Sequence, residues 1–261
     1  MPTFALQRTS LATPAQLRET VRLRVVPSAP AVCTSCGSLM FCMPGAGERD
    51  GGLQLDALVS QRIRVRKGDI LVHCGDAFRG LYAIRSGSCK SVVTTAGGQE
   101  QLAGYHISGD VIGAAAIFGS RHDATVTALE DSEFCVIPLE RMEAMARSDV
   151  GLQHRFHALM SREIGRERKV MLMLGAMRAE QRLAAFLLDL AERYAARGYS
   201  SSEFMLRMTR EEIGCHLGLK LETVSRLFSR FHREGLIRVQ GRDVRLIDRT
   251  ALRRLVDAAL H

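Results

Sequence analysis

Residues 208–231 decide the fold of the C-terminal part of the chain, and they read Met208-Thr-Arg-Glu-Glu-Ile-Gly-Cys-His-Leu-Gly218-Leu-Lys-Leu-Glu-Thr-Val-Ser-Arg-Leu-Phe-Ser-Arg-Phe231. Thr209 and Glu212 form a capping box, which predicts the start of a helix over 210–217. Gly218 is expected to end this helix, because glycine can adopt the positive φ of a tight turn. A second helix is predicted from 220 to 231, so the stretch is expected to form a helix-turn-helix.

The residues that follow predict a β-hairpin. Residues 235–239 and 244–247 are rich in apolar side chains and flank the turn sequence Gln240-Gly-Arg-Asp243. Two short strands around such a turn are typical of a hairpin. Beside a helix-turn-helix, the hairpin is interpreted as the wing of a winged helix.

The second helix of this motif has a polar face that can read DNA bases. Side chains that recur there at i+3 and i+4 spacing are Glu222, Ser225, Arg226 and Ser229. Arginine can bond guanine and glutamate can accept from cytosine in the major groove. We therefore predict DNA contacts from this face and from its neighbours Thr223 and Arg230. The alternative is a solvated face with an ion pair between Glu222 and Arg226.

Charge and hydropathy limit the classes of protein to which the chain can belong. The net charge is +8, which is consistent with a polyanionic partner but is weak support by itself. No apolar run approaches the roughly 20 residues that span a bilayer, and no signal peptide is recognisable. A cytoplasmic protein without membrane contact is therefore expected. No catalytic triad, phosphate loop or carboxylate pair stands out, so an enzyme is not predicted.

Short alternating runs bounded by glycine turns extend from about residue 61 to Pro138 and predict a small antiparallel barrel or roll. A helical pattern of about 25 residues follows Asp149, which is long for a globular helix and suits a dimer seam. The alternative is a core helix that packs on its own domain. The residues predicted for the seam are Leu152, Phe156, Leu159, Met160, Ile164, Met171 and Leu174.

The chain is thus expected to be an α+β protein with four parts. These are an N-terminal arm with clustered cysteines (1–48), a β-roll (49–148), a dimerisation helix (149–177) and a winged-helix domain (178–261). Residues 1–32 lack a steady period and are predicted to be irregular.

Three cysteines in the arm, Cys33, Cys36 and Cys42, have the spacing C-x2-C-x5-C. Thiols clustered so closely usually hold a metal, an iron–sulfur cluster or disulfides. Structural disulfides are disfavoured in the cytoplasm, and the total of seven cysteines is odd. The spacing alone does not separate zinc from an iron–sulfur cluster.

These residues together carry a resemblance to a known family. The chain resembles the fumarate-and-nitrate-reduction regulators, the oxygen-sensing branch of the family that includes the cyclic AMP receptor protein. The stretches that carry the resemblance are 81–87, 128–138, 181–186, 208–214, 217–219 and 222–226. It covers about residues 33–250, and it implies a cyclic-nucleotide-binding-domain roll that is similar to a cupin.

The resemblance implies a 4Fe-4S cluster held by Cys33, Cys36, Cys42 and a fourth ligand, Cys135. The intact cluster favours a homodimer that binds a site resembling TTGAT, four spacer bases, ATCAA, and oxygen destroys the cluster. Activation would proceed through contact with RNA polymerase. The family places a carboxylate in the dimer seam, and Glu167 corresponds to it. The two facing carboxylates repel each other, and the neighbouring cations Arg166, Arg168 and Lys169 are expected to soften this repulsion.

Other readings of the same residues stay open. The four cysteines can instead hold stabilising zinc, or act as a thiol or nitric-oxide sensor without a cluster. Cys74, Cys89 and Cys215 are expected to be bystanders, with Cys74 exposed in a turn.

A cyclic nucleotide is not expected in the roll. The stretch after Gly109-Asp-Val-Ile-Gly113 lacks the acidic residue that the ribose requires. The positions that would grip the phosphate carry His122 and Asp123, and an aspartate repels a phosphate. Arg121 next to them is not expected to compensate.

Overall fold

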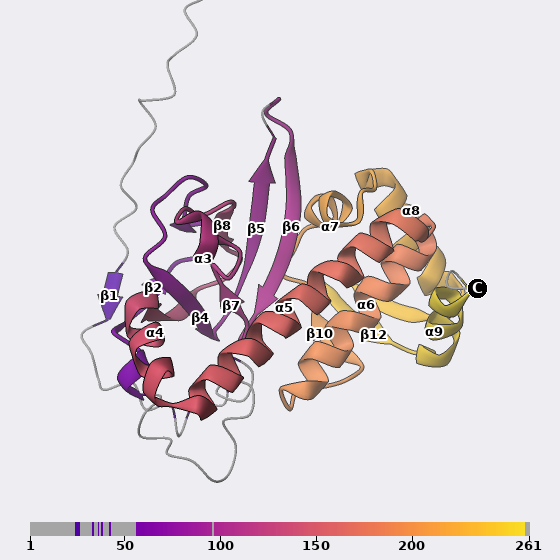
Figure 1. Ribbon diagram of the computed structural model, residues 1–261. Helices are drawn as coiled ribbons and strands as arrows, with labels where there is room; N and C mark the ends of the chain where they lie inside the picture. Colours follow the sequence, from indigo (N-terminus) through magenta and orange to yellow (C-terminus); the bar gives the residue numbers. More distant parts are fainter. Residues whose placement is uncertain are drawn as a thin grey trace, which may run out of the picture.

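The computed structural model describes residues 24–26, 33, 36, 38, 42, 56–95 and 97–258. They form a β-roll, a long helix that runs diagonally across the molecule, and a helical C-terminal domain with a small sheet (Figure 1). The expected fold class is therefore confirmed. The remainder of the arm predicted over 1–48 lies outside the described residues.

Two antiparallel sheets make up the roll, in the orders β1-β2-β9-β4-β7 and β3-β8-β5-β6. The elements are β1 Arg24–Val26, β2 Gln61–Val65, β3 Ile70–Val72, β4 Gly80–Ser86, β5 Ser88–Thr94, β6 Glu100–Ile107, β7 Val111–Ile112, α3 Ala116–Gly119, β8 Thr125–Ala128 and β9 Ser132–Pro138. Alternate side chains of a strand point to one face. Ile63 and Val65 of β2 are accordingly buried with Phe134 in the roll core.

Part of the predicted irregular arm is a strand, so that prediction is wrong at Arg24–Val26. This segment pairs antiparallel with β2, with Val25 opposite Ile63. Three residues are too few to show an alternating pattern, and the strand exists because β2 offers a free edge. The arm therefore returns to the roll shortly before the cysteines.

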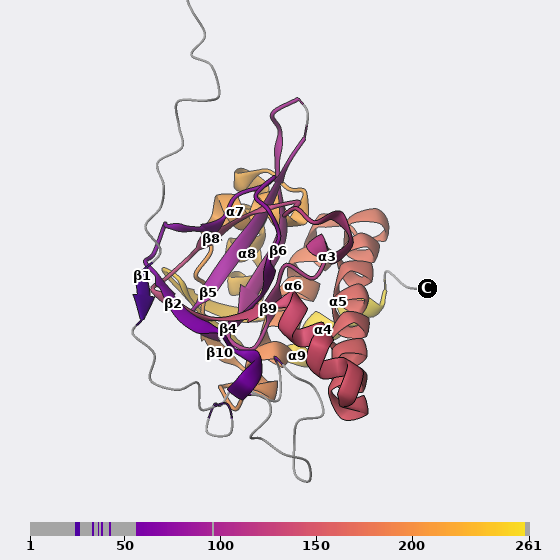
Figure 2. The same ribbon diagram turned by 60° about the vertical axis from the view of Figure 1, so that its left-hand side comes forward.

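Two helices follow the roll, α4 Leu139–Ser148 and α5 Val150–Ala176. Pro138 precedes the first turn of α4, and the Asp149 carboxylate caps α5 by accepting from the Leu152 N–H at 3.0 Å. At 27 residues, α5 is about 40 Å long, enough to reach from the roll to the C-terminal domain. Figure 2 shows α4 and α5 packed side by side.

The predicted helix-turn-helix is confirmed as α7 Arg210–Leu217 and α8 Leu221–Arg233. The Thr209 hydroxyl accepts from the Glu212 N–H at 3.1 Å, and the Glu212 carboxylate accepts from the Thr209 N–H at 2.7 Å. Gly218 has a φ of +62° at the end of α7. Helices α6 Ala179–Ala196 and α9 Arg249–Asp257 pack against each other in the same domain.

The predicted wing is also present, as β11 Ile237–Gln240 and β12 Asp243–Leu246. A third strand, β10 Glu203–Met205, pairs with β12 on its other side. Sequence patterning did not predict this strand, because its three residues are too few to show periodicity.

The helix-turn-helix is docked on the roll of its own chain. Lys90 of β5 forms an ion pair with Glu212 of α7 at 2.6 Å. The Leu102 N–H of β6 donates to the Cys215 thiol at 3.1 Å, and the hydroxyls of Tyr105 and Tyr194 are 3.0 Å apart. Within the described ranges, no helix combines the length and apolar character needed to cross a bilayer.

Candidate functional site

The four cysteines predicted as ligands line one small cavity at the base of the roll. Cys33, Cys36 and Cys42 come from the arm, and Cys135 comes from β9. The remaining wall is mostly apolar, with Leu58 among its side chains. Pairing of β9 with β2 and β4 fixes the position of Cys135 in the sheet. The fold therefore brings together thiols that are about a hundred residues apart in sequence.

The cavity suppresses ionisation of three of its thiols, those of Cys33, Cys42 and Cys135. Burial, assisted for Cys33 by the neighbouring Asp56 carboxylate, raises the pKa of Cys33 to about 12. Burial and the other thiols raise the pKa of Cys42 to about 12 and that of Cys135 to about 11. Buried thiolates therefore require a compensating cation, and bound metal supplies one. Four soft sulfur donors suit iron–sulfur clusters and zinc.

An arginine cluster borders this cavity. Arg62, Arg64 and Arg85 all form ion pairs with the one carboxylate of Glu133, at 3.2, 3.4 and 2.7 Å. Three guanidinium groups on one carboxylate leave a local excess of positive charge. Arg85 and Arg62 accordingly oppose the rise in the pKa of Cys135 that burial causes. The arginines therefore reduce, but do not cancel, the effect of burial on this thiol.

The thiols line the walls of the cavity rather than converge on one point. Across the described parts of the chain, no three His, Cys, Asp or Glu side chains are grouped closely enough to hold a single metal ion.

The other three cysteines lie elsewhere. Cys89 is completely buried in the roll core, and Cys74 is exposed as expected, with its thiol donating to the Asp123 carbonyl at 3.3 Å. Cys215 lies at the contact between α7 and β6. None of them lines the cavity of the four predicted ligands.

Helix α8 presents the predicted polar face to solvent. Its exposed side chains are Glu222, Ser225, Arg226 and Ser229, and the buried side chains of its opposite face are Val224, Leu227, Phe228 and Phe231. Within the described residues no ion pair joins Glu222 to Arg226, so both remain available to a ligand. Which of them touch bases stays a prediction.

The two flanking residues of this face are less accessible. Thr223 and Arg230 are half-buried. The Arg230 guanidinium forms ion pairs with Glu180 at 2.7 Å and Glu234 at 2.9 Å. These pairs hold Arg230 within its own domain, which makes it a weaker candidate for DNA contact than Arg226.

Helix α5 divides the predicted seam residues into two groups. Leu152 and Leu159 are buried against the roll of the same chain, so their assignment to a dimer seam is corrected. Phe156, Met160 and Leu174 are half-buried, and Glu167 is exposed. Ile164 and Met171 are 58% and 69% exposed, which leaves apolar surface free for a second chain. A long helix shows one period whether its apolar face meets its own domain or a partner, so sequence could not separate the groups.

A buried charge cluster, centred on Asp110, was missed by the sequence analysis. Its fully buried carboxylate pairs with Arg166 of α5 at 2.9 Å, with Arg193 of α6 at 2.5 Å, and with Arg197, which caps the end of α6, at 2.7 Å. It also accepts from the Ile107 N–H. The i, i+4 spacing of Arg193 and Arg197 was the only signal available. The cluster joins the roll to both helices.

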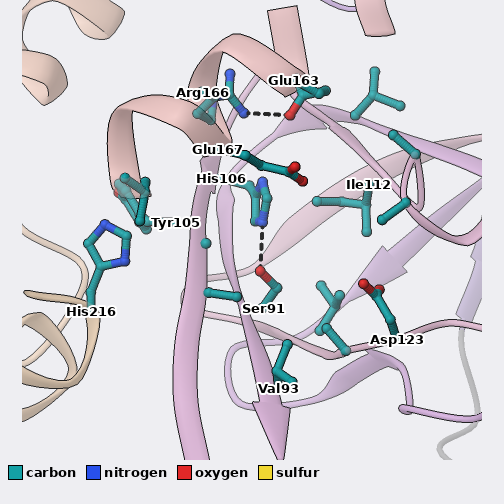
Figure 3. A pocket seen from close by; sticks show the side chains of 18 of the residues that line it. Ser91, Val93, Tyr105, His106, Ile112, Asp123, Glu163, Arg166, Glu167 and His216 are labelled. Atoms are coloured by element: carbon teal, nitrogen blue, oxygen red, sulfur yellow. Dashed lines mark hydrogen bonds and ion pairs between the residues drawn. The ribbon is translucent and has the colours of Figure 1, made fainter. Parts of the chain in front are cut away.

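A larger cavity of about 540 Å³ lies between the roll, α5 and α6 (Figure 3). His106 points into it, and burial lowers its pKa to about 3, so the ring is neutral. His122 and Asp123 line it, whereas Arg121 donates to the Gly75 carbonyl at 2.7 Å. The absence of a cyclic nucleotide stays a prediction, and so does the expectation that Arg121 does not compensate for Asp123.

Known proteins share this organisation. Residues 62–149 match the cyclic nucleotide-binding domain, and residues 181–255 match the Crp-like helix-turn-helix domain. The transcriptional regulatory protein btr of Bordetella pertussis is 48% identical, over 89% of this chain and 97% of btr. The fumarate and nitrate reduction regulatory protein of Escherichia coli K12 is 39% identical, over 85% of this chain and 89% of that protein.

Among solved structures, FixK2 from Bradyrhizobium japonicum superposes with a TM-score of 0.68. It is 29% identical, over 74% of this chain and 96% of FixK2. Both domains, their order and the long helix between them are thus shared with regulators of transcription. The chain belongs to the fumarate-and-nitrate-reduction branch of the CRP/FNR family of transcriptional regulators.

Proposed function

We propose that this protein is an oxygen-responsive transcriptional regulator that binds a 4Fe-4S cluster through Cys33, Cys36, Cys42 and Cys135. The cluster-loaded form is a homodimer that binds a site resembling TTGAT, four spacer bases, ATCAA, and acts through RNA polymerase. The observation that carries the proposal is the convergence of these four thiols, from two distant segments, on one cavity.

Packing supports a link between this cavity and the dimer helix. Cys42 and Cys135 belong to the same apolar cluster as Leu152, Leu159 and Met160 of α5. A change in the cavity therefore alters the packing of the helix, whose next turns carry the exposed Ile164 and Met171. Leu152 and Leu159, which are buried against the roll, thus connect the thiols to the proposed dimer seam.

When bound, the cluster supplies chemistry that is sensitive to oxygen. The chain's own contribution is to hold four thiolates, to surround them with apolar side chains, and to offset their charge with Arg62 and Arg85. Loss of the group leaves Cys33, Cys42 and Cys135 as thiols whose raised pKa keeps them protonated. The side chains around these neutral thiols would then repack, and the packing of α5 against them would change.

The test is an absorption spectrum of protein purified without oxygen, with iron and sulfide counts, before and after air is admitted. The expected protein is brown, holds about four irons per chain and bleaches in air. A colourless protein with zinc or without metal, after attempted cluster reconstitution, would overturn the oxygen-sensing mechanism. The assignment to a DNA-binding family would stand in that case.

Glu167→Ala is expected to dimerise in air, whereas the natural protein is monomeric there. Facing carboxylates across the seam repel each other. Arg166 softens this repulsion less than its position in the sequence suggests, because Asp110 and Glu163 already bind its guanidinium at 2.9 and 3.2 Å. The dimer dissociation constant in aerobic sedimentation should fall at least about tenfold.

Glu143→Ala, which removes the same charge from the exposed face of α4, is the control for this change and should leave the protein monomeric in air. A Glu167→Ala variant that stays monomeric at the same concentration would show that carboxylate repulsion does not limit the dimer.

Arg226→Ala is expected to weaken binding to the proposed site by about 1–3 kcal/mol and to relax the preference at one base pair. Its guanidinium is exposed on α8 and is the exposed cation of the predicted face. Fluorescence anisotropy with the intact site and with single-base variants measures both effects.

Arg233→Ala, which removes an exposed arginine near the end of the same helix, is the matched control and should keep the base preference of the natural protein. If Arg226→Ala also lost the same affinity for every sequence, Arg226 would be a phosphate contact and not a base reader.

A further inference from the structure

One guanidinium group joins the end of α5 to the turn of the helix-turn-helix. Arg182, in the first turns of α6, donates from Nε to the Met177 carbonyl at 2.9 Å and from Nη2 to the Leu174 carbonyl at 2.8 Å. Its Nη1 donates to the carbonyl of Leu217, the last residue of α7, at 2.9 Å. Figure 1 shows how α5, α6 and α7 approach one another here.

The chemistry of helix ends explains why an arginine occupies this position. The last carbonyls of a helix have no partner within the helix, and they carry the negative end of its dipole. A guanidinium group offers several donors in one rigid plane. Arg182 therefore satisfies carbonyls at the ends of α5 and α7 at the same time, and it fixes one end relative to the other.

The turn between α7 and α8 rests directly on this arginine. A Cβ atom added to Gly218 would lie 3.2 Å from Nη1 of Arg182 and 3.6 Å from Cδ2 of Leu174. The turn therefore lies against both the Arg182 guanidinium and the side chain of Leu174, near the end of α5. A rotation of the helix-turn-helix (α7 and α8, called the reader below) about α5 has to break these contacts.

Other polar connections of the helix-turn-helix lead to the roll and to α6, where Glu180 pairs with Arg230 of α8 at 2.7 Å. Lys90 pairs with Glu212 in the first turn of α7, and Leu102 accepts from the His216 ring at 3.2 Å. Without Arg182 the reader would remain attached to the roll through α7. The end of α7 that leads into α8 would, however, lose its bridge through Arg182 to the end of α5.

We propose that Arg182 is a positioning residue that sets the separation of the two reader helices, and thereby the spacing of the half-sites that the dimer accepts. The inference rests on the proposed dimeric, DNA-binding function. Two α5 helices meeting at a seam place each α8 at a distance set by the angle between α5 and its own reader. Half-sites one helical turn apart require one such distance.

The experiment measures binding of the full-length, anaerobically prepared protein to DNA duplexes whose half-sites are separated by three, four or five base pairs. The natural protein should prefer four. In Arg182→Gln, which cannot donate to three carbonyls at once, the ratio between the four-base and five-base affinities should fall about tenfold. Arg182→Lys should give an intermediate ratio, since an ammonium group can donate to only some of the three carbonyls that Arg182 binds.

Arg147→Gln removes the same charge from the exposed surface of α4 and should keep the ratio of the natural protein. The ratio is informative because partial unfolding lowers the affinity for all spacings equally. If Arg182→Gln does not fold, as judged by circular dichroism, Arg182→Lys carries the comparison.

Two outcomes have separate meanings. An unchanged spacing ratio in the folded Arg182 variants would overturn the positioning role and leave the proposed function intact. A natural protein that binds no spacing, or all spacings alike, would contradict the proposed function itself.

Discussion

Cys135→Ser is expected to yield a protein without the brown colour and without specific DNA binding. Cys135 is the thiol that β9 contributes to the cavity otherwise supplied by the arm. A serine hydroxyl is a poor ligand for iron, so the proposed cluster loses one of its four ligands. If dimerisation fails as a result, affinity for the palindromic site should fall by about a thousandfold, towards non-specific binding.

The measurement pairs an anaerobic absorption spectrum and iron count with DNA binding by the same preparation. Cys74→Ser is the matched control, because Cys74 is exposed and lies outside the cavity. It should keep the spectrum, the iron content and the affinity. A Cys135→Ser protein that holds as much iron as the natural chain, and responds to air as that chain does, would remove Cys135 from the ligand set.

Asp110→Asn should lower the free energy of unfolding by about 3–5 kcal/mol, because it leaves three guanidinium groups around a neutral amide. Arg166, Arg193 and Arg197 all bind the carboxylate in the natural protein. Urea unfolding at neutral pH measures the loss. Asp189→Asn is the control, since its carboxylate is 41% exposed and pairs, among the residues that the structure describes, with Arg193 alone at 3.6 Å. Its effect should stay below about 1 kcal/mol.

The same contacts predict how the difference depends on pH. Burial alone would raise the pKa of Asp110, but the three arginines outweigh burial and hold it well below its usual range. A depressed carboxyl pKa contributes stability that is fully present above the unfolded-state pKa of about 3.9 and is lost as pH falls towards the folded-state value. The gap between natural and Asp110→Asn proteins should therefore be constant from neutral pH to about pH 5 and narrow only below pH 4. A gap that closed already between pH 7 and 5 would mean that another group is responsible.

The link between Asp110 and the proposed switch is structural. Asp110 belongs to the roll, Arg166 lies on α5 beside Glu167, and Arg193 and Arg197 lie on α6 and at its C-terminal cap in the winged-helix domain. The carboxylate thus joins the three parts whose relative positions the proposed function requires. As urea is added to the Asp110→Asn protein, DNA binding should be lost over the same concentration range as the folded structure and not at a lower concentration.

Features encoded within a few residues could be predicted from the sequence. The capping box of Thr209 and Glu212, the glycine turn at Gly218 and the apolar period of α8 are local, and each was found where it was expected. The wing was predicted as two strands, but β10 was not, because three residues carry no usable period. The strand β1 was missed for the same reason.

Features that depend on which surface a side chain meets could not be predicted in this way. The apolar residues of α5 follow one helical period, yet Leu152 and Leu159 pack on the roll while Ile164 and Met171 remain exposed. The family resemblance indicated Cys135 as the fourth thiol, whereas spacing alone offered four unrelated cysteines. Arg182 and Asp110 gave no signal that would set them apart from other charged residues.

The sequence by itself determined the helix-turn-helix, the antiparallel roll and the long helix, because capping, turns and periodicity are properties of neighbouring residues. Only the tertiary structure decided that four thiols share one cavity, that Asp110 gathers three arginines, and that Arg182 joins α5 to α7. Those contacts are made between segments far apart in the chain, and they depend on how strands pair and helices cross after each element has formed.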